Sequence, residues 1–423
     1  MRCALIIPAW MPQELFPRQT AGSQINYWQP LGMLYIAAVL LKAGHEVRFF
    51  NGAFLTQEEI LRRVGEFDPH FAGIYATTFG WGKAMQTAEA VKRLNPEILT
   101  CAGGPYPIAL QEQCLHDGAH FDAVVTGEGE RTVPELLERL ESGRSLDGVL
   151  GVAFRRGVEK VHCANNGAWI VKNPPRPLIE DLDALPFPAR ELLPDCESYL
   201  PPPGTYRRKP VAALLTARGC DRNCLYCFQI DKRRRAGVRG VRYRSIENVL
   251  AEIEHCLGQG YREIKFLDDT LAADYDRALR LAQGIKARGL DFTWFASACV
   301  NQVDEPLLQA FKEAGCWAIL LGAESGVQKN LNTLRKGSTL DQIRTAVRAA
   351  QAVGLRVSTP FLFGIPGETY EDGLKTIEFA TELNPDLANF HALTPFPGTD
   401  LYDNAAKYGT ISRDLRDYTY QGA

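Results

Sequence analysis

The chain has 423 residues, a hydrophobic fraction of 46%, a charged fraction of 23% and a formal net charge of −3. These values are those of a soluble globular protein, and the length predicts two or three domains. The small net charge gives no general attraction to nucleic acid or to an anionic membrane. The longest apolar run, residues 31–41, has about half the length that crossing a bilayer requires. We therefore expect no integral membrane segment, no nucleic-acid partner and a cytoplasmic location.

The first 145 residues alternate short apolar runs with amphipathic stretches. Residues 1–8 predict a first strand rather than a signal peptide. Strands are predicted at 3–8, 46–50, 71–76, 98–102 and 122–125, with intervening helices that include 32–43, 80–94 and 132–141. Five strands joined by crossover helices predict a flavodoxin-like, doubly wound parallel sheet. Such sheets bind ligands beyond the carboxyl ends of their strands.

Two further regions follow this domain. The many prolines of residues 146–205 predict a surface connector. Residues 206–400 alternate again, with strands predicted at 211–216, 263–267, 292–297, 317–322, 356–363 and 387–392 and helices at 246–257, 275–288, 305–314, 340–353 and 370–383. Six βα units predict a partial (β/α)6 TIM-like barrel. We expect residues 401–423 to begin a C-terminal extension that is truncated.

Three of the eleven cysteines, Cys220, Cys224 and Cys227, form a CxxxCxxC motif directly after a predicted strand. Three thiolates can bind three irons of a 4Fe–4S cluster and leave the fourth iron open. A zinc site normally needs a fourth Cys or His, and this loop has none. The weaker alternative is a chance spacing of unligated cysteines. The others are scattered and predict buried small hydrophobes rather than a second cluster: Cys3, Cys101, Cys114, Cys163, Cys196, Cys256, Cys299 and Cys316.

This motif, followed by a βα series, resembles the radical S-adenosylmethionine (SAM) superfamily over residues 211–400. The resemblance implies that the open iron binds the amino and carboxylate groups of SAM, and that an electron then cleaves SAM to a 5′-deoxyadenosyl radical. It also implies anaerobic chemistry and an external low-potential electron donor such as flavodoxin or ferredoxin. Tyr226 matches an aromatic position beside the adenine.

Further matches stand at the carboxyl ends of successive predicted strands, where barrel active sites form. Each segment alone is also compatible with an ordinary turn. The resemblance implies contacts from Asp268 and Asp269 to the SAM amino group, from Glu324 and Ser325 to ribose and carboxylate, and from Gly364 and Ile365 to adenine.

Three features of this half stay open. His391 ends the last predicted strand, where a structural role is favoured over substrate contact. Cys299 stands where many relatives have an arginine, which leaves a SAM-carboxylate contact there in doubt. The basic stretch 232–244 predicts a solvated loop rather than a site for an anionic substrate.

The first domain carries three segments with ligand-binding character. PLGMLYI at 30–36 opens a helix, and CAGGPYP at 101–107 and VTGEGE at 125–130 follow strands. No GxGxxG follows the first strand, which argues against a dinucleotide site. The three segments resemble the cobalamin-binding domain of class B radical SAM methyltransferases and their relatives, a group that includes the anaerobic Mg-protoporphyrin ester cyclase. The resemblance implies that cobalamin is lined by Thr77, Thr78, Gly103, Gly104, Tyr106, Gly127 and Glu128. The alternative is that these glycines only make tight turns.

The Asp-x-His-x-x-Gly motif that supplies a cobalt-ligating histidine in other cobalamin proteins is missing from this sequence. His45 and His70 precede strands, at the opposite edge from the expected site, and His116 and His120 lack the motif's Asp and Gly. We therefore expect no protein histidine on cobalt. The resemblance implies C-methylation of an unactivated carbon in a small-molecule substrate. The open alternatives are a radical cyclase, oxygenation or rearrangement without methyl transfer, and a non-catalytic cobalamin or Fe–S sensor.

Overall fold

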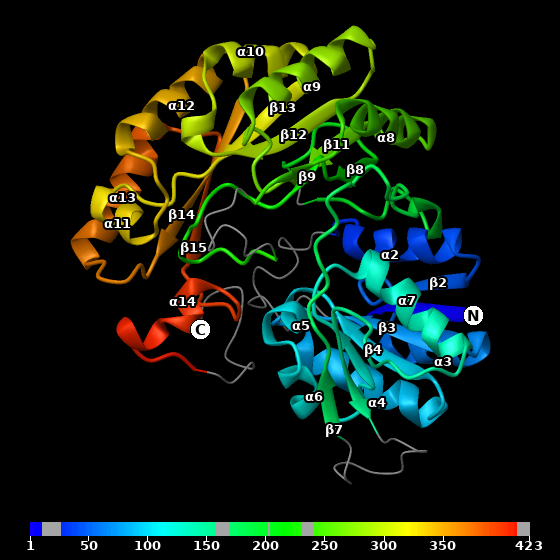
Figure 1. Cartoon of the computed structure of the whole chain (residues 1–423). Helices are drawn as coiled ribbons and strands as arrows, with labels where there is room; N and C mark the ends of the chain where they lie inside the picture. The colour runs from blue at the N-terminus through cyan, green and yellow to red at the C-terminus, as the bar shows by residue number, and fades with distance from the viewer. Residues whose placement is uncertain (11–26, 157–168, 202–203, 231–239, 413–423) are drawn as a thin grey trace.

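The computed structural model describes residues 1–10, 27–156, 169–201, 204–230 and 240–412. Figure 1 shows two α/β halves that face each other, the N-terminal one in blue to cyan and the C-terminal one in green to red. The N-terminal sheet has the strand order β2-β1-β3-β4-β5-β6-β7. Its strands are β1 (Arg2–Ile7), β2 (Glu46–Asn51), β3 (Phe71–Tyr75), β4 (Leu99–Gly103), β5 (Ala123–Val125), β6 (Val152–Arg156) and β7 (Trp169–Lys172).

The parallel order 2-1-3-4-5 confirms the flavodoxin-like prediction. Two apolar cores, one on each face of the sheet, hold its helices. They are α2 (Leu31–Lys42), α3 (Gln57–Phe67), α4 (Trp81–Leu94), α5 (Pro105–Leu110), α6 (Gln113–Asp117) and α7 (Gly129–Glu141). Strands β6 and β7 add to the sheet antiparallel. The sheet therefore extends past residue 145: short strand-like pieces were expected at 151–155 and 168–171 within the connector, and as β6 and β7 they join the N-terminal sheet.

The C-terminal half is a curved, fully parallel sheet of six strands in the order β15-β14-β13-β12-β11-β8, as the barrel prediction requires. These strands are β8 (Val211–Leu214), β11 (Glu263–Phe266), β12 (Thr293–Ala298), β13 (Cys316–Leu321), β14 (Arg356–Phe363) and β15 (Leu387–Ala392). Helices cover the outer face: α8 (Ile246–Gly258), α9 (Tyr275–Ala287), α10 (Glu305–Glu313), α11 (Gln328–Thr333), α12 (Leu340–Ala352) and α13 (Tyr370–Leu383).

Local sequence signals explain where the outer helices begin. Thr339 and Thr369 each cap a helix through a reciprocal capping box, which satisfies backbone N–H groups at the first turn. Ser245 and Asp274 cap α8 and α9 through a side-chain oxygen. Beyond β15 lies the short helix α14 (Asp400–Asp403). None of the helices in the described part of the chain combines the length and apolar character that spanning a bilayer requires.

A buried polar network joins the two halves. The Arg190 guanidinium, in the 3-10 turn η2 (Arg190–Leu192), donates to Glu252 of α8 at 2.7 Å. Arg244 pairs with the same carboxylate, which is 0% exposed. Gln29, just before α2, donates to the Tyr261 hydroxyl at 2.8 Å and accepts from the Ala213 N–H at 3.0 Å. Because buried charges and amides must be satisfied, these contacts fix the N-terminal half against the barrel.

Candidate functional site

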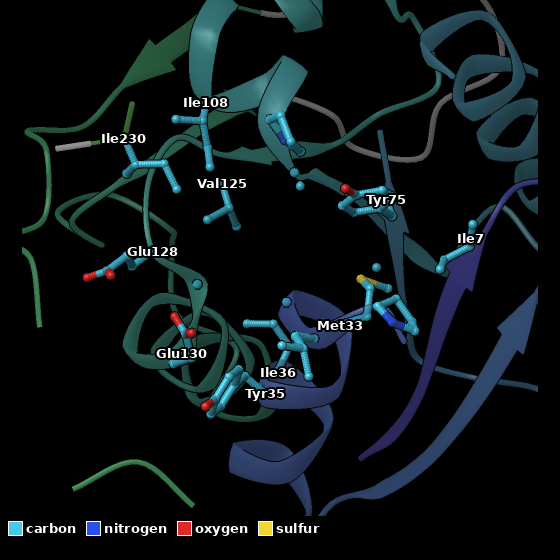
Figure 2. A pocket seen from close by; sticks show the side chains of 18 of the residues that line it. Ile7, Met33, Tyr35, Ile36, Tyr75, Ile108, Val125, Glu128, Glu130 and Ile230 are labelled. Carbon is cyan, nitrogen blue, oxygen red and sulfur yellow. The ribbon is translucent and has the colours of Figure 1, made fainter. Parts of the chain in front are cut away.

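One cavity lies between the carboxyl ends of the N-terminal strands and the mouth of the barrel. Its volume is about 700 Å³, which is large enough for a substantial organic ligand. Figure 2 shows Met33 and Ile36 of α2 on one side of this space and Ile108 and Val125 on another. From the barrel half, Gly219 and Asp269 line the same cavity. Both halves therefore open onto one chamber with largely apolar walls.

Glycines form the part of the wall expected to hold cobalamin. Gly103 ends β4, Gly127 follows β5, and Gly32 is the second residue of α2; all three line the cavity. A Cβ atom at any of them would meet no other atom within 4 Å, so the backbone there borders open space. A flat, bulky ligand can therefore approach these backbones closely, and the site fits a corrin ring.

Other residues expected around cobalamin have contacts within the N-terminal half or lie outside the lining of the cavity. The Thr77 hydroxyl accepts from the Gly80 N–H at 3.1 Å, and neither Thr77 nor Thr78 is among the residues that line the cavity. Tyr106 is buried, and its ring stacks on that of Trp81 with 5.0 Å between the two ring centres. Gly104 lines the cavity, but it is required for an internal reason. Its φ is +111°, and a Cβ there would approach the Ala76 carbonyl oxygen at 2.7 Å.

No histidine is among the described residues that line the cavity. His45 lies at the opposite end of the sheet, where its Nδ1 is 3.1 Å from the N-terminal amine. His70 accepts there from the Arg2 N–H at 3.0 Å. The lack of a protein ligand to cobalt stays a prediction, and the positions of these two side chains agree with it.

Glu128 lines the cavity and also bridges the two halves. Its carboxylate accepts from Arg218 at 2.9 Å and from Arg242 at 3.0 Å, while Glu130 accepts from Arg218 at 2.6 Å. Burial raises the pKa of Glu128, but the hydrogen bonds from Arg242 and the Ile179 N–H, with the charge of Arg218, lower it further than burial raises it. The pKa is therefore held below its usual range, and Glu128 is a buried anion in this network.

This network corrects the prediction for the end of the basic stretch. Arg242 and Arg244 are buried and paired with carboxylates, not solvated. Their partners lie far away in sequence or on another element, so the charge run alone gave no sign of the pairing. Residues 231–239, which hold the rest of the stretch, lie outside the described residues.

The cysteine loop follows β9 (Ala217–Arg218) at the mouth of the barrel. The Cys220 sulfur accepts from the Arg222 N–H at 3.4 Å, Cys224 is buried and Cys227 is exposed. A hydrogen bond between Cys224 and Cys227 lowers the pKa of Cys224, aided by the charge of Lys336, and raises the pKa of Cys227, while burial raises the pKa of Cys220. Cys224 is therefore the cysteine of the three whose thiolate, the form that binds metal, these surroundings favour.

Within the described residues, no three Cys, His, Asp or Glu side chains converge on the position of a single metal ion. A cubane does not require such convergence, because each thiolate binds a different iron. Among the described cysteines outside this loop, none belongs to a CxxC-type motif. The loop therefore fits a 4Fe–4S cluster rather than a mononuclear site.

A buried ion pair lies beneath the cysteine loop. Lys336 Nζ donates to Glu324 Oε1 at 2.6 Å. Burial lowers the pKa of Lys336, but the charges of Glu324, Cys224 and Cys299 raise it by more, so the amine stays cationic. Burial and the neighbouring Glu324 raise the pKa of Tyr226. Tyr226 packs against the apolar cluster of Leu334, Leu362 and Ile365, so two residues expected to contact adenine belong to one group of packed side chains.

Asp268 and Asp269 were both expected to contact SAM, but only Asp269 is accessible from the cavity. Asp268 is buried, and its carboxylate accepts from the Thr216 N–H at 3.1 Å and the Thr216 hydroxyl at 2.7 Å. Asp269 is exposed toward the cavity, and its charge acts on Cys220. Of the two, Asp269 is the carboxylate that a SAM ammonium could reach.

Ser325 and Gly364 also have internal partners. The Ser325 hydroxyl is buried, where it accepts from the Asn330 side chain at 3.2 Å. The Gly364 N–H donates to Glu368 at 2.6 Å, which fixes the loop after β14. Ser325 is therefore buried and held by an internal hydrogen bond, and its contact with ribose stays a prediction.

The structure also shows where Cys299 and His391 lie, the two residues whose roles the sequence left open. Cys299 directly follows β12 near the cysteine loop, where it interacts electrostatically with Cys220 and Cys224. The turn after it is tied to the loop, because Gln302 donates to Asp221 at 3.0 Å. His391 is exposed on the edge strand β15.

The chain is similar to known proteins over nearly its whole length. Residues 214–380 match the model of the Radical SAM superfamily, and residues 21–137 match the B12 binding domain. An uncharacterised methyltransferase of Pyrococcus horikoshii is 34% identical over 99% of this chain and 86% of its own length. The chain belongs to the cobalamin-dependent radical SAM family. It is an enzyme whose cofactors are cobalamin, SAM and a 4Fe–4S cluster.

Two other members of this wider group show how its reactions diverge. The anaerobic magnesium-protoporphyrin IX monomethyl ester cyclase of Rubrivivax gelatinosus is 29% identical over 90% of this chain and 67% of its own length. The structure of the radical SAM methyltransferase TsrM from Kitasatospora setae, with cobalamin and a 4Fe–4S cluster bound, has a TM-score of 0.73. That match is 19% identical and covers 96% of this chain and 74% of TsrM, so it supports the fold.

Several residues of this radical SAM site were not identified from the sequence. Arg218, Glu130 and Lys336 take part in buried ion pairs of the site. Arg218 stands next to the CxxxCxxC motif, which is the one local signal that could have singled it out. Glu130 is 88 positions from Arg218, so only the folded chain reveals their pairing.

Proposed function

We propose that the protein transfers a methyl group from SAM to an unactivated carbon of a small-molecule substrate. The observation that carries this proposal is the shared cavity, lined by Gly103 and Gly127 of the N-terminal half and by Gly219 and Asp269 of the barrel half. When bound, the cluster with SAM supplies a carbon radical and cobalamin supplies the methyl group. A substrate in this chamber can meet both cofactors without leaving it.

The chain's own residues bind and orient these groups. Cys220, Cys224 and Cys227 would hold the cluster, and the Asp269 carboxylate would orient the SAM ammonium at the mouth of the barrel. The apolar wall formed by side chains such as Met33 and Ile108 excludes water from a reactive carbon centre. An external low-potential donor such as flavodoxin or ferredoxin would supply the electron.

The names of two similar proteins support methyl transfer: the Pyrococcus horikoshii relative and TsrM are both methyltransferases. A second candidate is cyclisation or rearrangement without methyl transfer. It is favoured by the likeness to the Rubrivivax gelatinosus cyclase, which covers 90% of this chain. The two candidates use the same cleavage of SAM and differ in whether the SAM methyl group reaches the product.

The test follows the methyl group. The cofactor-loaded enzyme is incubated without oxygen with SAM that carries a deuterated methyl group, a chemical reductant and fractionated small-molecule extract. We expect S-adenosylhomocysteine and 5′-deoxyadenosine in near-equal amounts, and a small molecule that carries the deuterated methyl group. A Cys224→Ala protein should make no 5′-deoxyadenosine. If the wild type makes 5′-deoxyadenosine and an altered small molecule but never S-adenosylhomocysteine, methyl transfer is wrong and the second candidate replaces it.

A further inference from the structure

Lys265 is an amine inside the barrel that the chemistry described so far does not use. It lies in the middle of β11, and its neighbours Ile264 and Phe266 pack under the outer helices. Because side chains alternate along a strand, Lys265 points to the opposite, inner face of the sheet. Leu267, two residues further along the same face, lines the cavity between the two halves. Lys265 is therefore one step deeper along the strand than Leu267 and is not itself among the described residues that line the cavity.

Aromatic rings hold the Lys265 ammonium in place. Its Nζ lies 3.6 Å from the centre of the Phe295 ring on β12 and 4.7 Å from that of Trp28, which itself lines the cavity. Phe295 is the residue paired with Lys265 in the β11–β12 register, so both side chains point into the barrel. Ring faces favour a cation and give it no hydrogen-bond acceptor.

Among the described residues, no carboxylate forms an ion pair or hydrogen bond with Lys265. The nearest candidate, Glu263, is already satisfied at the bottom of the barrel. Its Oε2 accepts from the N–H groups of Arg207 and Arg208 at 2.8 and 2.6 Å, and its Oε1 accepts from the Trp317 indole at 2.9 Å. Glu263 acts on Lys265 only through space. Burial lowers the pKa of Lys265 to about 8, so the amine is still mostly protonated at neutral pH.

A partly buried cation is normally paired, and both Leu267, on the same face of the strand, and Trp28, whose ring contacts the ammonium, line the cavity. We propose that Lys265 binds a carboxylate group of the substrate, whose apolar body extends past Leu267 and Trp28 into the cavity. One ammonium between ring faces balances one negative charge, so it matches a carboxylate monoanion and leaves half the charge of a phosphate dianion unpaired. This inference rests on the proposed function in one respect, because the substrate is taken to enter this cavity.

The experiment measures access to the amine itself and needs no turnover. The cofactor-loaded protein is treated with an acylating reagent, and modification of individual lysines is followed by peptide mass spectrometry. Benzoate is the anionic probe, and benzamide, which has the same shape without the charge, is its control. Lys286, an exposed residue on α9, reports general reactivity. We expect benzoate at about nine times its dissociation constant to slow acylation of Lys265 about tenfold, and we expect no change with benzamide or at Lys286.

Equal effects of benzoate and benzamide on Lys265, or equal slowing of Lys286, would overturn the proposal. Calorimetry on Lys265→Gln and Lys265→Met gives a second measurement, since both variants should lose the preference for benzoate. Retained preference in a variant that still binds cobalamin and iron would also overturn it. If a variant fails to fold, the protection result on the wild type decides. Absence of S-adenosylhomocysteine would remove the methyl-transfer proposal and leave the protection result standing, so the two failures are distinguishable.

Discussion

Arg218 gives the sharpest test of how the two cofactor sites are held together. Arg218 lies on β9, just before the cysteine loop. Its guanidinium pairs with Glu128 and Glu130, which stand after the carboxyl end of β5 in the N-terminal half. It also lies 5.1 Å from the centre of the Tyr35 ring. An Arg218→Gln substitution removes the cation and keeps most of the side-chain volume.

The expected loss of unfolding free energy depends on whether Glu128 and Glu130 still have a cationic partner after the substitution. Glu128 keeps Arg242, whose guanidinium lies 2.9 Å from its carboxylate. Glu130, which is 7% exposed, loses the cation that pairs with it among the described residues. Removal of one partner from a buried ion pair costs about 3–5 kcal/mol of unfolding free energy. For a cooperative unit of about 150–250 residues this lowers Tm by about 6–20 °C.

The assay is thermal unfolding of the cofactor-loaded protein, followed by circular dichroism. Arg93→Gln is the matched control, because Arg93 pairs with Glu89 on the exposed face of α4 and should contribute at most about 0.5 kcal/mol. A double variant, Arg218→Gln with Glu130→Gln, should recover part of the loss, since no buried charge is then left unpaired. If Arg218→Gln unfolds within about 1 °C of the wild type, the bridge is not a structural link between the halves and this reasoning fails.

Four further outcomes are expected. Cys224→Ala should lower the iron content of anaerobically reconstituted protein from about four per chain. Cys101→Ala, which changes a buried cysteine of β4, is the control and should leave the iron content unchanged. Full iron content in the Cys224 variant would contradict the cluster assignment. Gly103→Leu should abolish cobalamin retention with little loss of Tm, because its side chain would project into the open cavity; gel filtration with absorbance detection checks this. Asp269→Asn should weaken SAM binding in equilibrium dialysis at unchanged iron content, and unchanged affinity would exclude it as the ammonium partner. The lowered pKa of Glu128 contributes stability that is complete above the ordinary glutamate pKa and is lost as pH falls through the lowered folded value. Glu128→Gln should therefore lose less stability on acidification than the wild type, measured by urea unfolding at several pH values.

The sequence by itself determined the architecture, since both periodic patterns and turn signals are local. The predicted strand at 356–363 and the predicted helix at 370–383 agree with β14 and α13 residue for residue. Long apolar runs bounded by glycine and capping residues specify such elements without knowledge of their neighbours. The CxxxCxxC spacing predicted the cluster because its three thiolates lie within a few residues, whereas SAM and cobalamin were implied by the resemblance of short segments to a known family.

Tertiary structure decided which side chains face the cofactors. Asp268 and Asp269 are adjacent in the sequence, yet one is buried against Thr216 and the other opens into the cavity. Both residues follow the end of β11, where the alternation of a strand no longer applies, so only the packing of the folded chain decides which carboxylate is buried. Likewise, the cation that pairs with Glu130 comes from Arg218, 88 positions away. Glu263 accepts a hydrogen bond from the distant Trp317 indole, whereas no carboxylate among the described residues pairs with Lys265. Partners separated by dozens of residues meet only when two domains fold and dock, so the charge balance of this site is a property of the folded chain.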